Sequence, residues 1–215
     1  PTRQQLEGID GLQGSQGRLK GLELVWLRDR LEAFLIQVQG SARLELTDGS
    51  IMTVGYAGNT DHPYTGIGRE LVKDGKLRQE DLTLPALQAY FEQNSQELSQ
   101  YLPRNQRFIF FRETGGAPAT GSLGVAVTAE RSIATDKTQF PPGALALIQV
   151  QIPGRADSTD LEPQFVSRYV LDQDTGSAII GPGRVDLFMG TGIRAGERAG
   201  LINSTGQLYY LLLKK

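Results

Sequence analysis

Short apolar runs separated by glycine and proline dominate the hydrophobic pattern of this chain. Within these runs β-branched and aromatic residues are frequent, and 26 glycines and 10 prolines are spread between them over the 215 residues. Such a pattern is typical of strands joined by turns. The sequence therefore predicts a mainly β protein in which helices are a minority.

The clearest predicted element is a β-hairpin between Ala42 and Gly55. The runs ARLEL and SIMTV flank the tripeptide Thr47, Asp48 and Gly49. Asp-Gly is a favoured pair for a tight two-residue turn, because the central positions of such a turn need positive φ. We therefore expect two antiparallel strands here.

Three segments carry helix start or stop signals. Thr83 precedes Leu84 and Pro85, which gives a capping hydroxyl and a proline in the first turn of a helix over ALQAYFEQN. A second helix is predicted from Ser95 in SQELSQYL, and a third over GIGRELVKDGKL ends at Gly75. The apolar residues of the first helix repeat at helical spacing and are expected to pack on a core; they are Leu87, Tyr90 and Phe91.

A change of composition divides the chain near residues 113–121. The segment ETGGAPATG is rich in Gly, Ala and Pro and has no apolar period, so we place a domain boundary there. After it, strands are predicted at GVAVTA, ALALIQVQI, QFVSRYVL, SAII, VDLF and QLYYLLL, divided by the polar loop PGRADSTDLEP. Short strands at regular intervals favour a closed β-barrel.

Composition narrows the classes of function. With 39% hydrophobic and 21% charged residues, the chain can bury a core as one large or two small domains. The net charge of −2, with both signs scattered, argues against nucleic acid as a partner. Cysteine is absent, and a zinc site or a Ser-His-Asp triad would depend on the single histidine, His62.

No apolar run reaches the ~20 residues of a membrane span, and the N-terminus lacks the regions of a signal peptide.

Three aspartates of the second half each stand in a short signature: Asp136 in SIATDKTQFPPG, Asp174 in QDTGSAI and Asp186 in RVDLFMGTG. Asp186 has apolar neighbours and precedes a glycine-rich turn, which is the pattern of an acid at the end of a strand. Burial there would raise its pKa, because desolvation penalises the charged form. A carboxyl that stays protonated near neutral pH can donate a proton to a leaving oxygen, as a glycosidase acid does.

The order and spacing of these signatures resemble the C-terminal portion of the membrane-bound lytic murein transglycosylase A (MltA) family. The stretches that carry the resemblance are FLIQVQGSARLELTDGS, GYAGNTDHPYTGIGREL, RFIFF, SIATDKTQFPPG, QDTGSAIIGPGRVDLFMGTG, AGERAG and GQLYYLL. The resemblance implies a double-psi β-barrel domain into which a second, smaller β-barrel-like domain with short helices is inserted, with a groove between them. It assigns residues 1–112 to the inserted domain and residues 113–215 to the later half of the barrel, the three-aspartate (3D) domain. The earlier barrel strands would lie in a further N-terminal segment of the same protein.

The resemblance also implies a reaction, the nonhydrolytic cleavage of the β-1,4 bond between N-acetylmuramic acid and N-acetylglucosamine in peptidoglycan. The product would carry a 1,6-anhydromuramyl end, and no metal or organic cofactor is expected. A glycosidase normally uses two carboxylates, but here one suffices, because the C6 hydroxyl of the sugar attacks C1 within the same molecule. Asp186 matches the catalytic aspartate of the family. Asp174 and Asp136 match the other two signature aspartates, and either support Asp186 or only close turns.

Candidate sugar-binding residues lie in the first half of the chain. Gln37 and Gln39 are expected on one face of a strand, because side chains repeat every second residue, and amides suit sugar hydroxyls and N-acetyl groups. A tyrosine ring can stack on a sugar face, although core positions explain the tyrosines here equally well. The other candidates are Ser41, Tyr56, Gly58, Tyr64 and Thr65.

Two other functions stay open. The aspartic protease signature resembles the tripeptide Asp174, Thr175 and Gly176. The protease reaction needs a pair of carboxylates, so an aspartic protease would have to be a symmetric dimer of this chain. The chain could also be a noncatalytic glycan-binding barrel module. The resemblance implies peptidoglycan glycan strands as the partner and the bacterial periplasm or outer membrane as the location. We expect the chain to be monomeric.

Overall fold

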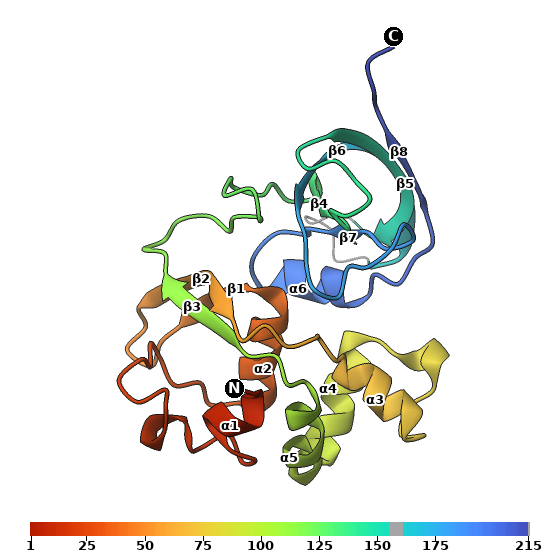
Figure 1. Cartoon of the computed structure of the whole chain (residues 1–215). Coiled ribbons are helices and arrows are strands. Elements are labelled where there is room, and N and C mark those ends of the chain that lie inside the picture. Colours follow the sequence, from red (N-terminus) through yellow and green to blue (C-terminus); the bar gives the residue numbers. More distant parts are fainter. Residues whose placement is uncertain (155–160, 215) are drawn as a thin grey trace. The chain divides into compact units, whose positions relative to one another are not determined.

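The structure, a computed structural model, describes residues 1–154 and 161–214 (Figure 1). The chain divides into two compact units, Pro1–Ala117 and Pro118–Lys215. Each unit contains one β-sheet, and the fold is mainly β. No helix in the described ranges has the length and apolar character needed to cross a membrane.

The N-terminal unit combines a helical core with a three-stranded antiparallel sheet in the order β1-β2-β3. Its strands are β1 (Ser41–Glu45), β2 (Ile51–Asn59) and β3 (Ile109–Glu113). Its α-helices are α1 (Arg3–Glu7), α2 (Arg30–Gln39), α3 (Ile67–Lys73), α4 (Leu84–Gln93) and α5 (Leu98–Tyr101). Short 3-10 helices are η1 (Gly14–Gln16), η2 (Gln79–Asp81), η3 (Ser95–Glu97) and η4 (Leu102–Arg104).

The core of this unit comes from its helices. Its buried residues are Leu31, Phe34, Ile67, Leu71, Leu87, Phe91, Tyr101 and Leu102, with Tyr90 packed against them. The predicted packing face of α4 is therefore confirmed. Among the described residues the three strands form an open sheet, so the β-barrel-like shape expected for this half is not seen.

The predicted hairpin is confirmed, with a longer turn than expected. The N–H of Leu46 donates to Ser50 O, and the N–H of Gly49 donates to Leu46 O, both at 2.9 Å. The loop between these strands therefore contains three residues instead of two. Gly49 has a φ of +83°, a backbone conformation that favours glycine.

The helix start at Thr83 and the stop at Gly75 are confirmed. Thr83 Oγ1 accepts a hydrogen bond from the N–H of Ala86 at 3.3 Å, and a proline stands in the first turn of α4. Gly75 follows α3 with a φ of +70°. The segment from Ser95 forms η3 before α5 instead of one continuous helix.

The sequence QVQGS ends helix α2, so the strand predicted for Gln37 and Gln39 is wrong. Asp29 caps the start of this helix with its side chain, and Gly40 ends it in the left-handed conformation. The strand was inferred from the spacing of the two glutamines, but both helix caps are present in the sequence and determine the structure. Gln37 and Gln39 therefore share no strand face.

A buried arginine joins separate parts of the N-terminal unit. The guanidinium of Arg3 donates to the backbone oxygens of Asn105 (3.1 Å) and Arg107 (2.8 Å) and to Gln37 Oε1 (2.7 Å). It also pairs with Glu7 at 3.4 Å and lies over two phenylalanine rings. Burial lowers the pKa of Arg3, and the charge of Glu7 opposes this shift. Arg3 therefore links α1, α2 and the segment that leads into β3.

The C-terminal unit is built on a five-stranded sheet in the order β7-β4-β6-β5-β8. The strands are β4 (Ser132–Ala134), β5 (Leu145–Pro153), β6 (Pro163–Asp174), β7 (Asp186–Leu187) and β8 (Gln207–Tyr210), and helix α6 spans Ile193–Gly200. β4 runs parallel to β6, whereas all other pairs are antiparallel. Figure 1 shows the strong curvature of β5 and β6. The buried core consists of Ile133, Ala146, Ile148 and Val170.

Four of the predicted strands in this unit are confirmed, and they correspond to β5, β6, β7 and β8. The other two are wrong, because GVAVTA contributes only an isolated bridge from Ala126 to Thr120 and SAII lies in a turn. Most of the predicted polar loop falls on residues 155–160, which lie outside the described ranges. Where the chain is described, β7 and β8 are the edges of the sheet, and no closed barrel is seen.

Replacing Arg3 by Ala is expected to lower the free energy of unfolding by about 3–5 kcal/mol, the range for removing one partner of a buried pair. The loss arises because the backbone oxygens, the Gln37 amide and the Glu7 carboxylate that Arg3 contacts would stay buried without it. Chemical denaturation followed by circular dichroism measures the change. The control is Arg43→Ala, because Arg43 is an exposed arginine on β1. Equal losses in the two variants would contradict the role of Arg3.

Candidate functional site

The strand β4 brings the three signature aspartates together. In the register of the sheet, Ala134 pairs with Asp174 of β6 on one side and with Asp186 of β7 on the other. Asp136 lies two residues beyond Ala134, just after the end of β4. Neighbouring strands are about 4.8 Å apart, so the backbones at Asp174 and Asp186 are separated by roughly 10 Å. Three acids that are far apart in sequence therefore meet at one end of the sheet.

Asp186 begins the edge strand β7, and its side chain is 47% exposed. Arg184 donates to both carboxylate oxygens, from Nε at 2.9 Å and from a terminal nitrogen at 3.2 Å. The expected burial of Asp186 is therefore wrong. Side chains alternate along a strand, and Leu187 packs against the core, so Asp186 faces the opposite side, toward solvent.

Asp136 is buried, and both of its oxygens accept hydrogen bonds. Oδ1 accepts from the backbone N–H (2.9 Å) and the hydroxyl (2.7 Å) of Thr138. Oδ2 accepts from the N–H of Gly181 at 2.7 Å, in the loop between β6 and β7. These hydrogen bonds, that of Gly181 first, lower the pKa of Asp136 because they favour the charged form. Asp136 therefore joins the end of β4 to the loop that precedes Asp186.

Asp174 lies at the end of β6 and also engages the backbone. Its Oδ1 accepts from the N–H of Ser122 at 2.8 Å, and its backbone oxygen accepts from the N–H of Thr135 at 3.2 Å. The hydroxyl of Thr175 donates to the backbone oxygen of Thr135 at 2.9 Å. These contacts fix the end of β6 against the end of β4.

A fourth aspartate, Asp172, is fully buried beside this site. Its Oδ2 accepts hydrogen bonds from the hydroxyls of Tyr210 (2.6 Å) and Thr135 (2.7 Å), and its Oδ1 pairs with Lys137. Burial, and next the hydrogen bond to Asp172, raise the pKa of Tyr210 to about 12. The four residues form a satisfied polar cluster inside the C-terminal unit.

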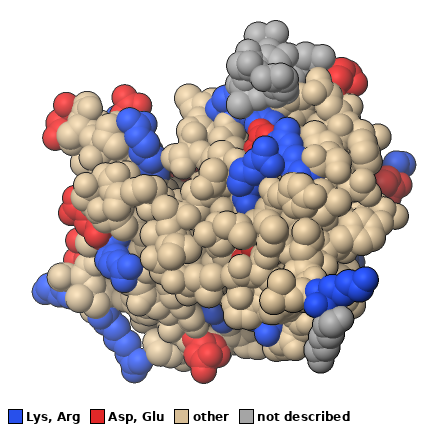
Figure 2. All heavy atoms as spheres, turned by 90° about the horizontal axis from the view of Figure 1, so that it is seen from above, with Lys and Arg blue, Asp and Glu red and all other residues tan. Residues whose placement is uncertain are grey.

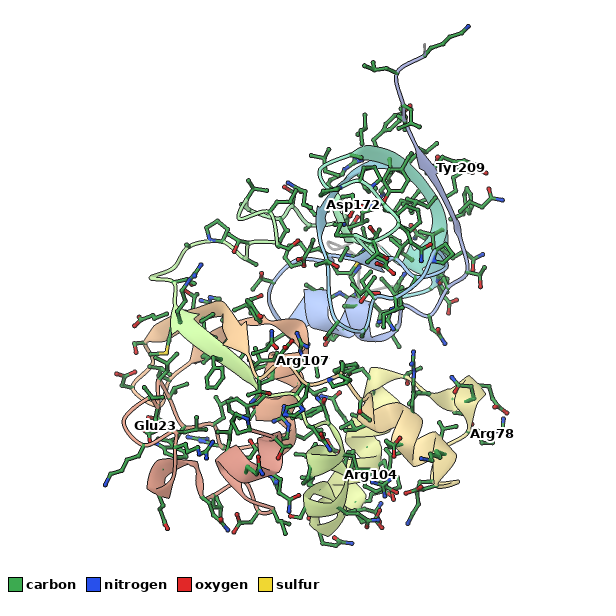
Figure 3. The ribbon with its side chains drawn as sticks, in the orientation of Figure 1. Glu23, Arg78, Arg104, Arg107, Asp172 and Tyr209 are labelled. Carbon is green, nitrogen blue, oxygen red and sulfur yellow. The ribbon has the colours of Figure 1, made fainter. Side chains whose placement is uncertain are left out.

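Asp172 was not predicted from the sequence, although a signal was present. Asp172 stands two residues after Val170, so both side chains lie on the same face of β6, and Val170 belongs to the buried core. Figure 3 shows Asp172 among the side chains enclosed by the curved strands. An aspartate on the core face of a strand indicates a buried partner of opposite charge.

The sugar-binding candidates differ in how accessible they are. The amide oxygen of Gln37 accepts from Arg3 and from the N–H of Ile109, so this residue has a structural role. Tyr56 is 48% exposed, which excludes a core position for it. Its hydroxyl accepts from Asn59 Nδ2 at 2.5 Å.

The remaining sugar-binding candidates lie on or near strands β1 and β2. Gln39 is exposed at the end of α2, Ser41 is half-buried at the start of β1, and Tyr64 is half-buried before α3. Gly58 lies at an irregularity in the pairing of β2 with β3. The N–H of Thr65 donates to Asn105 Oδ1 at 3.2 Å. Ser41 and Gly58 thus belong to one sheet with Tyr56, and Gln39 adjoins it.

In the ranges that the structure describes, no cluster of three or more His, Asp or Glu side chains has an arrangement that could bind a metal ion. On the face shown in Figure 2, several lysine and arginine side chains gather in one group around an acidic side chain, and the others are scattered with uncharged areas between them.

Comparison with known proteins connects both units to a single family. Residues 1–112 match the MltA specific insert domain, and residues 131–212 match the 3D domain. The membrane-bound lytic murein transglycosylase A of Escherichia coli (strain K12) is 32% identical over 190 residues, which cover 87% of this chain and 51% of that protein.

Solved structures agree with the sequence matches. The crystal structure of a membrane-bound lytic murein transglycosylase from Agrobacterium tumefaciens aligns with a TM-score of 0.79 and 34% identity, covering 91% of this chain and 53% of that one. The structure of E. coli MltA with bound chitohexaose aligns with a TM-score of 0.73 and 29% identity, covering 85% and 54%. This chain spans about half the length of the relatives it matches. Because the insert-domain match alone covers residues 1–112 of the 215, the chain belongs to the MltA family.

Proposed function

We propose that this chain carries the catalytic acid and part of the glycan-binding groove of a lytic transglycosylase. The reaction is cleavage of the β-1,4 bond between N-acetylmuramic acid and N-acetylglucosamine in peptidoglycan, with formation of a 1,6-anhydromuramyl end. Membership of the MltA family supports the reaction class. The chitohexaose bound by E. coli MltA supports a glycan as the ligand.

One observation carries the choice of Asp186 as the acid. Among the signature aspartates, Asp136 and Asp174 both accept hydrogen bonds from backbone N–H groups and serve as connections between loops and strands. Asp186 instead is exposed, and the contacts described for its carboxylate come from a flexible side chain, that of Arg184. A group that must reach a substrate oxygen has to be accessible.

The proposed reaction uses Asp186 twice. The protonated carboxyl donates its proton to the glycosidic oxygen as the bond from this oxygen to C1 breaks, and N-acetylglucosamine leaves as an alcohol. The carboxylate then accepts the proton of the C6 hydroxyl of N-acetylmuramic acid while O6 forms the bond to C1. The acid is regenerated and no water is consumed. Intramolecular attack has a high effective molarity, so no second catalytic carboxylate is required.

Because Asp186 is exposed and paired with Arg184, the substrate must also change the surroundings of this carboxylate. In the free chain both carboxylate oxygens contact Arg184, so a bound glycan has to release this pair before the first proton transfer. A glycan that covers the site also excludes water from it, and desolvation favours the neutral form of a carboxyl group. Binding and acid formation are therefore coupled in this proposal.

The proposed architecture and location follow the family. The parallel pairing of β4 with β6, beside antiparallel neighbours, is consistent with part of a double-psi β-barrel. We place the protein in the bacterial cell envelope, at the outer membrane or in the periplasm, because its relatives are named membrane-bound. We assign sugar contacts to the exposed residues of the N-terminal unit; they are Tyr56 and Gln39, with Ser41, Gly58, Tyr64 and Thr65 nearby.

Replacing Asp186 by Asn is expected to reduce the release of anhydromuropeptides from purified peptidoglycan by about 10²–10⁴-fold, the usual contribution of an acid-base group. Mass spectrometry of the soluble products measures the rate. The control is Asp81→Asn, because Asp81 is likewise exposed and paired with an arginine, Arg78, at 3.0 Å. Unchanged release from the Asp186 variant would exclude Asp186 as the acid. Absence of products from the parent chain, both alone and with the further N-terminal segment of the protein added, together with retained glycan binding, would instead indicate a noncatalytic glycan-binding module.

Replacing Asp136 by Asn is expected to lower stability at neutral pH, and the deficit should become smaller as the pH falls. The pKa of Asp136 is lowered in the folded chain, so its contribution is present above its unfolded pKa of about 4 and is lost as pH falls through the folded value. Chemical denaturation of parent and variant between about pH 7 and about pH 3 measures the difference in their free energies of unfolding. A deficit that stays constant over this range would contradict the proposed role of the charge.

Replacing Tyr56 by Ala is expected to weaken chitohexaose binding about tenfold, which corresponds to ~1.4 kcal/mol. The reason is the loss of an exposed ring that can stack on a sugar face. Isothermal titration calorimetry measures the affinity. The control is Tyr169→Ala, because Tyr169 is 57% exposed on β6, outside the proposed sugar-binding residues. Equal affinities of the two variants would show that Tyr56 does not contribute to glycan binding.

A further inference from the structure

Glu130 has a backbone conformation that is uncommon for a residue with a side chain. Its φ is +59°, in the left-handed region that favours glycine. It lies in the turn that leads into β4, where the N–H of Arg131 donates to Thr128 O at 3.0 Å. A strained residue persists only where its surroundings fix it, and such residues are frequent at functional sites. The contacts of Glu130 show what fixes it.

The main chain of Glu130 contacts the strand that carries Asp186. Its N–H donates to Phe188 O at 2.6 Å, and the N–H of Phe188 donates to Ser132 O at 3.0 Å. Phe188 follows directly after β7, which contains only Asp186 and Leu187 and lies at the edge of the sheet. Because β7 is so short, these two hydrogen bonds are a large part of what attaches it to the sheet.

The side chain of Glu130 is fixed by two arginines. Its carboxylate pairs with Arg168 of β6 and, at 2.6 Å, with Arg198 of α6. Arg198 is buried, and its guanidinium also donates to the backbone oxygen of Pro153 at 3.2 Å. Burial, and next the charge of Arg198, lower the pKa of Arg168. Without the carboxylate, two neighbouring guanidinium groups would lose the anion between them.

Close packing next to β7 supports the same connection. A Cβ atom on Gly190 would lie 3.3 Å from Ala129 Cβ and 3.6 Å from Ala195 Cβ. The loop after β7 therefore packs tightly between the turn that contains Glu130 and helix α6. A shift of the turn cannot be absorbed by empty space around this loop.

We propose that Glu130 is a positioning residue for Asp186. The Glu130 cluster, which consists of Glu130, Arg168 and Arg198, fixes the strained turn, and the main chain of this turn fixes β7. The inference rests on the proposed function, because the place of Asp186 matters for turnover only if Asp186 is the acid. Small displacements of a reacting group cost large factors in rate. Glycan affinity, which we assign to the N-terminal unit, is not expected to depend on the cluster.

The test compares Glu130→Gln with Glu197→Gln. Glu197 is the matched control, since it lies on α6 and pairs with Arg194 at 3.1 Å but is half exposed. For Glu130→Gln we expect kcat to fall by at least about tenfold with KM within about twofold. Amide exchange measured by NMR should be at least about tenfold faster at Glu130 and Phe188, with the amides of β5 and β6 unchanged. Unchanged exchange at Glu130 and Phe188, or uniformly faster exchange across the sheet, would overturn the proposal.

A second variant covers the case in which Glu130→Gln does not fold. The double change Glu130→Gln with Arg198→Met removes the buried cation together with its partner, and such replacements are often tolerated. We expect this variant to fold and to show the same fast exchange at Phe188; slow exchange would overturn the proposal. If the parent chain shows no turnover even with the further N-terminal segment of the protein added, the proposed function fails, whereas the exchange measurement still decides the role of Glu130.

Discussion

The site depends on one constraint, the position of β4 between β6 and β7. Ala134 pairs with Asp174 on one side and with Asp186 on the other, and Asp136 follows two residues later. The parallel pairing with β6 places the C-terminal ends of β4 and β6 at the same end of the sheet. The antiparallel pairing with β7 then brings the start of β7 to that end. Without β4, three distant signatures would have no common location.

The aspartates at this end of the sheet differ in the contacts that their carboxylates make. Asp136 and Asp174 accept backbone hydrogen bonds, and Asp172 is neutralised by Lys137 inside the unit. Asp186 alone among these four is exposed to the extent that a substrate could reach it. The carboxylates of Asp136, Asp172 and Asp174 therefore connect loops and strands, whereas that of Asp186 is the accessible one. This division of roles fits the proposal that a site rich in acids uses a single acid-base group.

Much of the fold could be predicted from the sequence where local signals agreed. The hairpin at Gly49 and the helix start at Thr83 have strong local signals, and the apolar pattern located the long strands β5 and β6. β4 contains only three residues, too few for a pattern, and its place in the sheet depends on pairing with distant segments. The segment around Gln37 was predicted wrongly, because the two-residue spacing of its glutamines was taken as a strand pattern although Asp29 and Gly40 cap a helix there. The burial of Asp186 was overestimated, since the direction of a side chain depends on which neighbour faces the core.

The most direct test of the central claim is the chemistry of the product. Peptidoglycan would be incubated with the chain in water labelled with heavy oxygen, and the new chain ends analysed by mass spectrometry. The account predicts 1,6-anhydromuramyl ends without the label, because the C6 hydroxyl of the sugar is the nucleophile. Reducing ends that contain the label would show that water attacks C1, and would contradict a mechanism in which Asp186 acts without an activated water.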